Sequence, residues 1–277
     1  MREEILSDHG GEQLALSGEQ LRSATSNLEA WQDSYYAAQQ DLQASRRAKP
    51  WWKRVLGVST AVEREALART QSAHREVAWA DYDRQQIDQR FRQQSAGVQG
   101  EQTLAWGLSE LDDSWVMLRG YRNRRGETDH VLVGPLGVWM VEVKRRRIRL
   151  HVSGDDWWYE KISSRGYVVD KGWAVDGGGR SWSRQVNEIA FELARWLDKN
   201  RHYVPIRTAV MIMHDHAVLG DIINPTVSLI GTRPVELLEA MRTHAFPLDE
   251  PTCDKIVDLI RRDHKFHGRQ RGRSQRR

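Results

Sequence analysis

Two carboxylates and a lysine in the middle of the chain have the residue types of a metal-dependent hydrolytic site. Glu142 and Lys144 lie two positions apart at the end of an apolar segment, and Asp129 lies shortly before that segment. Carboxylate oxygens are the ligands that Mg²⁺ and Mn²⁺ prefer. A lysine beside a metal-bound water can orient that water or help to deprotonate it. The three residues together predict hydrolysis of phosphodiester bonds.

A β-hairpin is needed to bring these residues together. Residues 131–133 and 138–143 are short runs rich in β-branched and aromatic residues, and residues 134–137 supply a Gly-Pro-Leu-Gly turn. Because side chains alternate along a strand, Glu142 and Lys144 share one face, while the other face carries apolar residues that point into the core. Folding the first strand back beside the second predicts that Asp129 lies close to Glu142.

An exposed ion pair is the alternative interpretation of Glu142 and Lys144, because half-buried strands often carry such pairs. The setting favours the catalytic interpretation. Glu142-Val143-Lys144 is the only Glu-x-Lys in the chain, and it lies where an apolar strand ends.

Several spaced elements resemble the nuclease-related domain (NERD) family of the restriction-endonuclease-like PD-(D/E)xK superfamily, over about residues 99 to 215. The matching elements are Gly100-Glu101, Thr128-Asp129-His130-Val131, Gly134-Pro135-Leu136-Gly137-Val138, Val141-Glu142-Val143-Lys144 and Gln185. The resemblance implies a restriction-endonuclease-like α/β fold, with a central mixed sheet flanked by helices, and a nuclease activity. The family usually has a proline shortly before the glutamine, whereas here residues 182–184 read Trp-Ser-Arg.

The resemblance also assigns roles to single residues. Asp129 and Glu142 are expected to bind Mg²⁺ or Mn²⁺, with the Val143 carbonyl as a further ligand, and Lys144 aligns or activates the attacking water. Glu101 is the candidate third carboxylate, although an acidic residue at a helix start also interacts favourably with the helix dipole. Gln185 is expected to contact phosphate or water.

Arginines flank this segment on both sides. Arg124 and Arg125 precede it, and Arg145 and Arg147 follow it. Arginines beside a carboxylate cluster fit binding of a phosphate backbone, of DNA or alternatively of RNA. For each arginine alone, a solvated surface position is the simpler interpretation.

Composition limits the class of protein. The chain has 277 residues, one cysteine (Cys253), no apolar run long enough to cross a bilayer, and no signal-peptide core at its start. These features predict a cytoplasmic protein that is not transmembrane. The net charge is +4, and residues 261–277 contribute eight Lys/Arg against one Asp, a net of +7. The basic end therefore suits nonspecific contact with nucleic acid.

The first third of the chain predicts an antiparallel helical hairpin over residues 12–95, after a disordered leader of residues 1–11. Leucine or tyrosine recurs every seven residues from Leu14 to Leu42, as in a coiled-coil seam. A Pro-Trp-Trp tip interrupts the helices at residues 50–52. Trp51 and Trp52 among basic residues would fit peripheral membrane contact, a protein partner or self-association, or packing at the helix ends.

The rest of the chain completes the predicted organisation. Residues 95–98 are expected to be a linker, residues 99–265 the nuclease-related α/β domain, and residues 266–277 a basic disordered tail. The function predicted is metal-dependent hydrolysis of DNA. The alternative is a non-catalytic nucleic-acid-binding or scaffold protein whose hairpin recruits a partner or a membrane surface.

Overall fold

The computed structural model describes residues 1–274, with side chains to residue 269, and divides the chain into two compact units. One unit contains residues 11–95. The other contains residues 1–10 and the chain from residue 96 onward.

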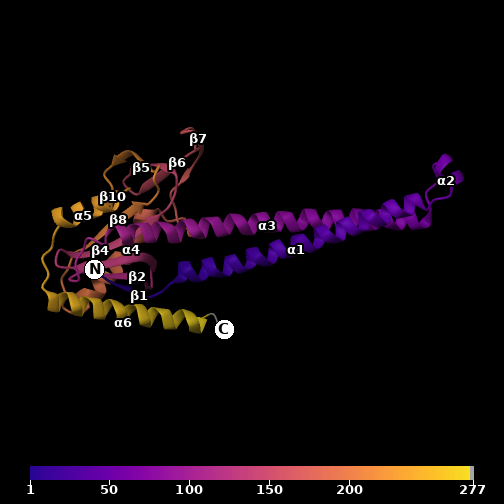
Figure 1. The fold of residues 1–277 in the computed structure, drawn as a ribbon. Helices are drawn as coiled ribbons and strands as arrows, with labels where there is room; N and C mark the ends of the chain where they lie inside the picture. Colours follow the sequence, from indigo (N-terminus) through magenta and orange to yellow (C-terminus); the bar gives the residue numbers. More distant parts are fainter. Residues whose placement is uncertain (275–277) are drawn as a thin grey trace. The chain divides into compact units, whose positions relative to one another are not determined.

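Residues 11–95 form the predicted helical hairpin (Figure 1). It is built from α1 (His9–Arg47), the short α2 (Trp51–Val55) and α3 (Ala61–Gly107). Gly18 lies against Phe91, and the Thr70 hydroxyl donates to the Ala38 carbonyl at 3.1 Å, so the two long helices run antiparallel. Leu28 and Leu42 of the expected seam are buried.

The expected linker at residues 95–98 is wrong, because α3 continues through it to Gly107. Ser95, Ala96 and Val98 are compatible with helix, and a single glycine such as Gly97 costs a helix only about 1 kcal/mol. At the end of α3, Leu104 and the next residue after the helix, Leu108, are fully buried in the α/β unit, and this packing stabilises the last turns of the helix.

The α/β unit is built on a six-stranded mixed sheet in the order β1-β2-β3-β4-β8-β10. The antiparallel strands are β2 (Val116–Asn123), β3 (Gly126–Gly134) and β4 (Gly137–Lys144). β8 (Ile206–Ile212) pairs in parallel with both β4 and β10 (Leu229–Gly231). The central mixed sheet expected from the sequence is confirmed.

The expectation of a disordered leader is wrong. Residues Arg2–Ile5 form β1, which pairs in parallel with β2 at the edge of the sheet. The Arg2 amide donates to the Trp115 carbonyl at 2.8 Å, and Arg261 donates to Glu4 at 2.9 Å. Contacts to residues distant in the sequence hold this strand, and no local sequence pattern marks it.

A second sheet follows in the order β7-β6-β5-β9. Its strands are β5 (Ile148–Ser153), β6 (Asp156–Ile162), β7 (Val168–Trp173) and β9 (Val218–Ile223). β9 has a weak strand pattern in the sequence, because Gly220 and Asp221 interrupt its apolar residues.

Helices cover both faces of the central sheet. One face packs against α4 (Trp182–Lys199) and α6 (Glu250–Ser274), and the other packs against the end of α3 and α5 (Pro234–Thr243). β4 is therefore buried on both sides: Val138 and Met140 face α4, while Trp139 and Val141 face α5. This layered arrangement confirms the predicted fold class.

The basic end of the chain differs from the expected disordered tail. Residues 266–274 continue α6, which lies along the β2 side of the sheet in Figure 1. Residues 275–277 of the expected tail lie outside the described residues. Among the helices that the structure describes, none is both long and apolar enough to cross a bilayer.

Candidate active site

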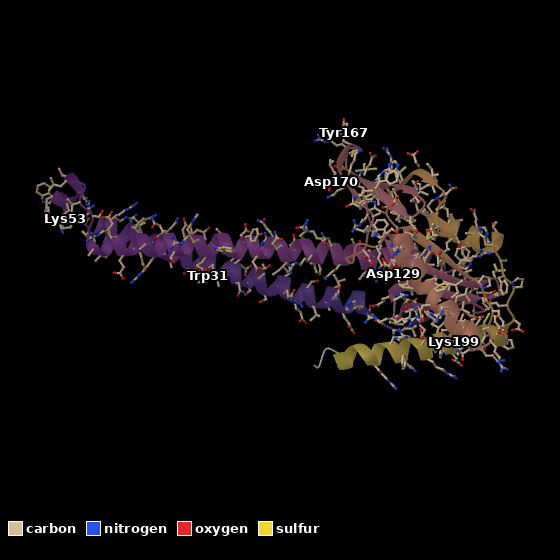
Figure 2. The ribbon with its side chains drawn as sticks, turned by 180° about the vertical axis from the view of Figure 1, so that it is seen from behind. Trp31, Lys53, Asp129, Tyr167, Asp170 and Lys199 are labelled. Carbon is tan, nitrogen blue, oxygen red and sulfur yellow. The ribbon has the colours of Figure 1, made fainter. Side chains whose placement is uncertain are left out.

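The β3–β4 hairpin brings Asp129 and Glu142 together, as the sequence predicted. His130 pairs with Val141, so the next antiparallel position places Asp129 beside Glu142. Asp129, labelled in Figure 2, accepts a hydrogen bond from the Val143 amide at 2.6 Å. The two carboxylates therefore lie side by side on neighbouring strands.

Glu142 is the centre of a side-chain cluster. One of its oxygens, Oε1, accepts a hydrogen bond from Lys144 Nζ at 2.5 Å and another from Gln185 Nε2 at 3.0 Å. The side chain is only 3% exposed, so the interpretation as an exposed ion pair does not hold. The other oxygen, Oε2, is buried and has no hydrogen-bond partner among the described residues, and the same is true of Gln185 Oε1.

The first turn of α4 positions Gln185. Ser181 is the N-cap of this helix, and its hydroxyl accepts a hydrogen bond from the Arg184 amide at 3.3 Å. The helix thus starts at Trp182 without the proline usual in the family, and its first turn presents Gln185 to Glu142. A serine N-cap replaces the conformational preference that proline would give.

Burial and like charge dominate the electrostatics. Burial, and next the Glu142 carboxylate, raise the pKa of Asp129 well above its usual range. Burial by itself would lower the pKa of Lys144, but the carboxylates of Glu142 and Asp129 outweigh it and raise that pKa. Lys144 is therefore an ammonium in this structure.

Glu101 lies near the two other carboxylates but is held by an arginine. Arg119 Nη2 donates to Glu101 at 3.3 Å, and Arg119 Nη1 donates to Glu3 of β1 at 2.9 Å. Burial raises the pKa of Glu101, Arg119 opposes this, and Glu142 adds to it. The electrostatic influence of Glu142 indicates that Glu101 belongs to the same neighbourhood. Arg119 was not found from the sequence, because its role depends on β1.

A steric constraint explains why residue 100, which precedes this glutamate, is a glycine. A Cβ at this position would lie 3.0 Å from Arg145 Cβ and 3.3 Å from Val143 Cγ1. Only glycine allows α3 to pass this close to the end of β4 without displacement. The Gly100-Glu101 pair therefore fixes the approach of α3 to the site.

Trp182 and Arg146 were also not recognised as site residues in the sequence. The Lys144 ammonium lies 5.8 Å from the centre of the Trp182 ring, and the exposed Arg146 guanidinium lies 5.5 Å from it. Arg146 also lies 5.6 Å from the ring of Tyr159. The alternation that places Glu142 and Lys144 on one face would have placed Arg146 there too, had it been extended by one step.

Of the four arginines predicted to bind nucleic acid, three donate hydrogen bonds to other protein groups and the fourth lies at an exposed turn. Arg145 donates to Gln99 at 2.9 Å, Arg147 to the Ser164 carbonyl at 3.3 Å, and Arg124 to Glu192 at 2.6 Å. Arg125 is exposed at the β2–β3 turn. Of the arginines after β4, it is Arg146 that lies beside Lys144.

The carboxylate oxygens of Asp129 and Glu142 meet part of the requirement for binding a hard divalent cation. Buried Glu142 Oε2 without a hydrogen-bond partner and the adjacent Asp129 are oxygen ligands of the kind that Mg²⁺ prefers. Within the described part of the chain, however, no group of three His, Cys, Asp or Glu side chains is close enough to hold a metal ion. Glu101 therefore does not complete an acidic triad in this arrangement. The assignment of the Val143 carbonyl as a further ligand stays a prediction.

Comparison with known families gives one match. A family model described as the nuclease-related domain matches residues 96–213, a segment that contains Glu101, Asp129, Glu142, Lys144 and Gln185. No curated protein and no solved structure matches the chain significantly. The matched segment confirms the resemblance seen in the sequence, because residues 96–213 match the model of the nuclease-related domain family.

Proposed function

We propose that this chain is a metal-dependent nuclease that hydrolyses phosphodiester bonds of DNA at Asp129, Glu142 and Lys144. One observation carries the proposal. Glu142, on β4, is contacted at one oxygen by Lys144 and by Gln185 of α4, while its second oxygen is buried without a hydrogen-bond partner. Such a carboxylate is prepared to bind a cation, because an unpaired buried oxygen is otherwise costly.

Asp129 and Glu142 would hold Mg²⁺ or Mn²⁺. When bound there, the ion supplies positive charge that polarises the scissile phosphate and lowers the pKa of a bound water. Asp129 already accepts the Val143 amide at 2.6 Å, and this hydrogen bond fixes its carboxylate beside Glu142. The backbone of β4 therefore orients one carboxylate and carries the other.

Lys144 would act as a hydrogen-bond donor. In hydrolysis, a water oxygen forms a bond to phosphorus, the bond from phosphorus to the leaving sugar oxygen breaks, and that oxygen gains a proton. An ammonium at Lys144 can orient the water or stabilise charge on a phosphate oxygen as the bond forms. Gln185 restrains Glu142 and offers its own carbonyl oxygen to the same region.

Arg146 and Trp182 would contact the substrate. An exposed guanidinium beside an aromatic ring can bind a phosphate while the ring restricts its position. We assign Arg119 a positioning role, because it holds Glu101 and contacts β1 at the same time.

The proposal is tested by incubating the purified chain with circular DNA, linear DNA or RNA in Mg²⁺, Mn²⁺ or EDTA. We expect DNA cleavage in Mg²⁺ or Mn²⁺ and none in EDTA. Cleavage that persists in EDTA would contradict the metal dependence. Cleavage of RNA but not of DNA would support the proposed chemistry, with RNA as the substrate in place of DNA.

A non-catalytic nucleic-acid-binding or scaffold protein is the second candidate. It is favoured by the absence of a three-residue metal group in the described residues and by the engagement of Asp129 with a backbone amide. This candidate predicts DNA binding in EDTA that a metal leaves unchanged, with no cleavage by folded protein. The Asp129→Asn substitution would then leave DNA binding unaltered and would have no activity to abolish.

A further inference from the structure

The tip of the helical hairpin exposes a group of apolar side chains that the fold does not use. This apolar tip consists of Trp51, Trp52, Val55, Leu56 and Val58, which are 76%, 48%, 77%, 68% and 49% exposed. They occupy α2 and the turn after it, where the chain reverses between the two long helices. In Figure 2 this end of the hairpin is marked by Lys53.

Backbone hydrogen bonds hold the tip in place. The Leu56 amide donates to the Trp52 carbonyl at 3.1 Å, and the Val58 amide donates to the Lys53 carbonyl at 3.1 Å. Gly57, with a φ of 67°, reverses the chain at a conformation that suits glycine. Because these bonds are between backbone atoms, the apolar side chains are available for contact with something else.

Basic residues surround the apolar tip. Residues 42–62 contain five Lys/Arg and no Asp or Glu. Glu63, the first acidic residue after this segment, lies 3.0 Å from Lys49 and 3.6 Å from Arg46. Among the described residues, Arg47, Lys53 and Arg54 form no ion pair with a carboxylate. The apolar tip is therefore bordered by unneutralised positive charge.

We propose that the apolar tip inserts into the interface of an anionic lipid bilayer. Tryptophan is enriched at the level of lipid headgroups, where its ring is partly apolar and its N–H can reach water or a headgroup. Lysine and arginine beside it are attracted to anionic lipids. An apolar insertion combined with a basic border supplies the two contributions that stable peripheral binding needs.

The form of the apolar tip favours a bilayer over a protein. The five apolar side chains project from a single short helix and the turn that follows it, which is the outer bend of a hairpin. A bilayer interface receives such a projection without a matching cavity, whereas a protein would have to supply a concave apolar pocket with an acidic border. The charge of the tip also matches a surface that is negative throughout.

Flotation of the full-length chain with lipid vesicles tests this proposal. The vesicles contain phosphatidylcholine with phosphatidylglycerol, or phosphatidylcholine alone, and the solution contains neither divalent metal nor nucleic acid. We compare the parent with a Trp51→Ala, Trp52→Ala double variant and with an Arg47→Gln, Lys53→Gln double variant. Trp79→Ala is the matched control, since Trp79 is 70% exposed on α3 away from the tip.

We expect the parent and the Trp79→Ala variant to float with the anionic vesicles. Each tip variant should partition about tenfold less into these vesicles. Binding of the parent to phosphatidylcholine alone should be weaker and should not depend on Arg47 and Lys53. Circular dichroism should show unchanged helix content, because none of the substituted side chains is buried.

Two results would overturn the proposal. The parent could fail to float with the anionic vesicles, or the Trp51→Ala, Trp52→Ala variant could float as well as the parent. If the parent does not float and the tip substitutions lower the mass measured by light scattering, the apolar tip mediates self-association instead. Because the assay contains no metal or DNA, its result is independent of the proposed nuclease activity.

Discussion

In the proposed reaction, the charge on Lys144 is needed for hydrolysis and not for metal binding. Its ammonium donates to Glu142 at 2.5 Å but is not itself a candidate metal ligand. We therefore expect Lys144→Ala to retain the affinity for Mn²⁺ and to lower the cleavage rate at least about 100-fold. Calorimetry and single-turnover cleavage measure the two quantities on the same protein.

Lys199→Ala is the matched control for this prediction. Lys199 is exposed in the last turn of α4, at the opposite end of that helix from Gln185 (Figure 2). This variant should cleave at the parental rate. If Lys144→Ala cleaves as fast as Lys199→Ala, Lys144 has no role in the reaction.

Arg146 and Arg145 are adjacent residues for which we expect different effects. Arg146 is exposed beside Trp182, whereas Arg145 is committed to Gln99. Arg146→Ala should weaken DNA binding in EDTA about fivefold and reduce the slope of log affinity against log salt by about 0.9. Arg145→Ala should change both quantities less. An equal or larger loss with Arg145→Ala would show that the assignment of phosphate binding to Arg146 is wrong.

The burial of His130 predicts how the free energy of unfolding depends on pH. The ring is fully buried, neither nitrogen has a partner, and burial followed by Arg119 lowers its pKa to about 3. The pKa in the unfolded chain is about 6.5. The unfolded state therefore binds the proton first as the pH falls, and this contribution to stability, complete above pH 6.5, is lost between pH 6.5 and pH 3.

We expect His130→Leu to remove this loss. Between pH 7 and pH 4 the parent should lose about 3 kcal/mol more free energy of unfolding than the variant. Urea titrations of both proteins at the two pH values measure the difference. Equal losses of the free energy of unfolding in the parent and the variant would show that burial does not lower the pKa of His130 as described.

At the scale of the element, the N-terminus of α4 positions Gln185. Ser181→Ala removes the side-chain acceptor of the Arg184 amide and should lower the free energy of unfolding by about 1 kcal/mol. Ser181→Thr keeps an acceptor and should lower it much less. Urea denaturation compares the two variants. A similar loss in both would mean that the hydroxyl does not cap the helix.

The elements near Glu142 were predictable because local pattern and tertiary role agree. The β3–β4 hairpin has strand-forming residues around a turn, and α4 has an apolar face that the sheet buries. Such agreement is typical of sequences that specify one structure. The positions of Asp129 and Glu142 followed directly from this hairpin.

Elements held by distant contacts were not predictable. The four residues of β1 include two glutamates and an arginine, and only pairing with β2 makes them a strand. The contacts of Arg119 with Glu3 and Glu101 depend on that pairing and were missed for the same reason. The continuation of α3 through Gly97 likewise depends on burial of Leu104 and Leu108, which no local signal near Gly97 reveals.

At the scale of the whole molecule, the α/β unit supplies rigid support for the site. β4 is central in its sheet, between β3 and β8, and helices pack against both faces. Glu142 and Lys144 therefore project from a strand that has a neighbouring strand on each side and helices on both faces. Gln185 projects from a helix packed on the same sheet. Sites supported in this way retain their geometry better than sites on loops.

The helical unit has a different physical character. Few of its side chains are buried, and those that are include small residues such as Ala24, Ala66 and Ala73. Large apolar side chains are exposed at the apolar tip and also at separate positions along the two long helices, such as Leu16 and Trp79. The chain thus separates a packed unit that carries the candidate site from a helical unit that exposes the apolar tip.

The most direct test of the nuclease account is single-turnover cleavage of circular DNA in Mg²⁺ by the parent and by Glu142→Gln. The glutamine keeps the size of the side chain and removes its charge, so the fold should remain. We expect metal-dependent cleavage by the parent and a loss of at least about 100-fold in the variant. Parental cleavage by Glu142→Gln would contradict the assignment of the site.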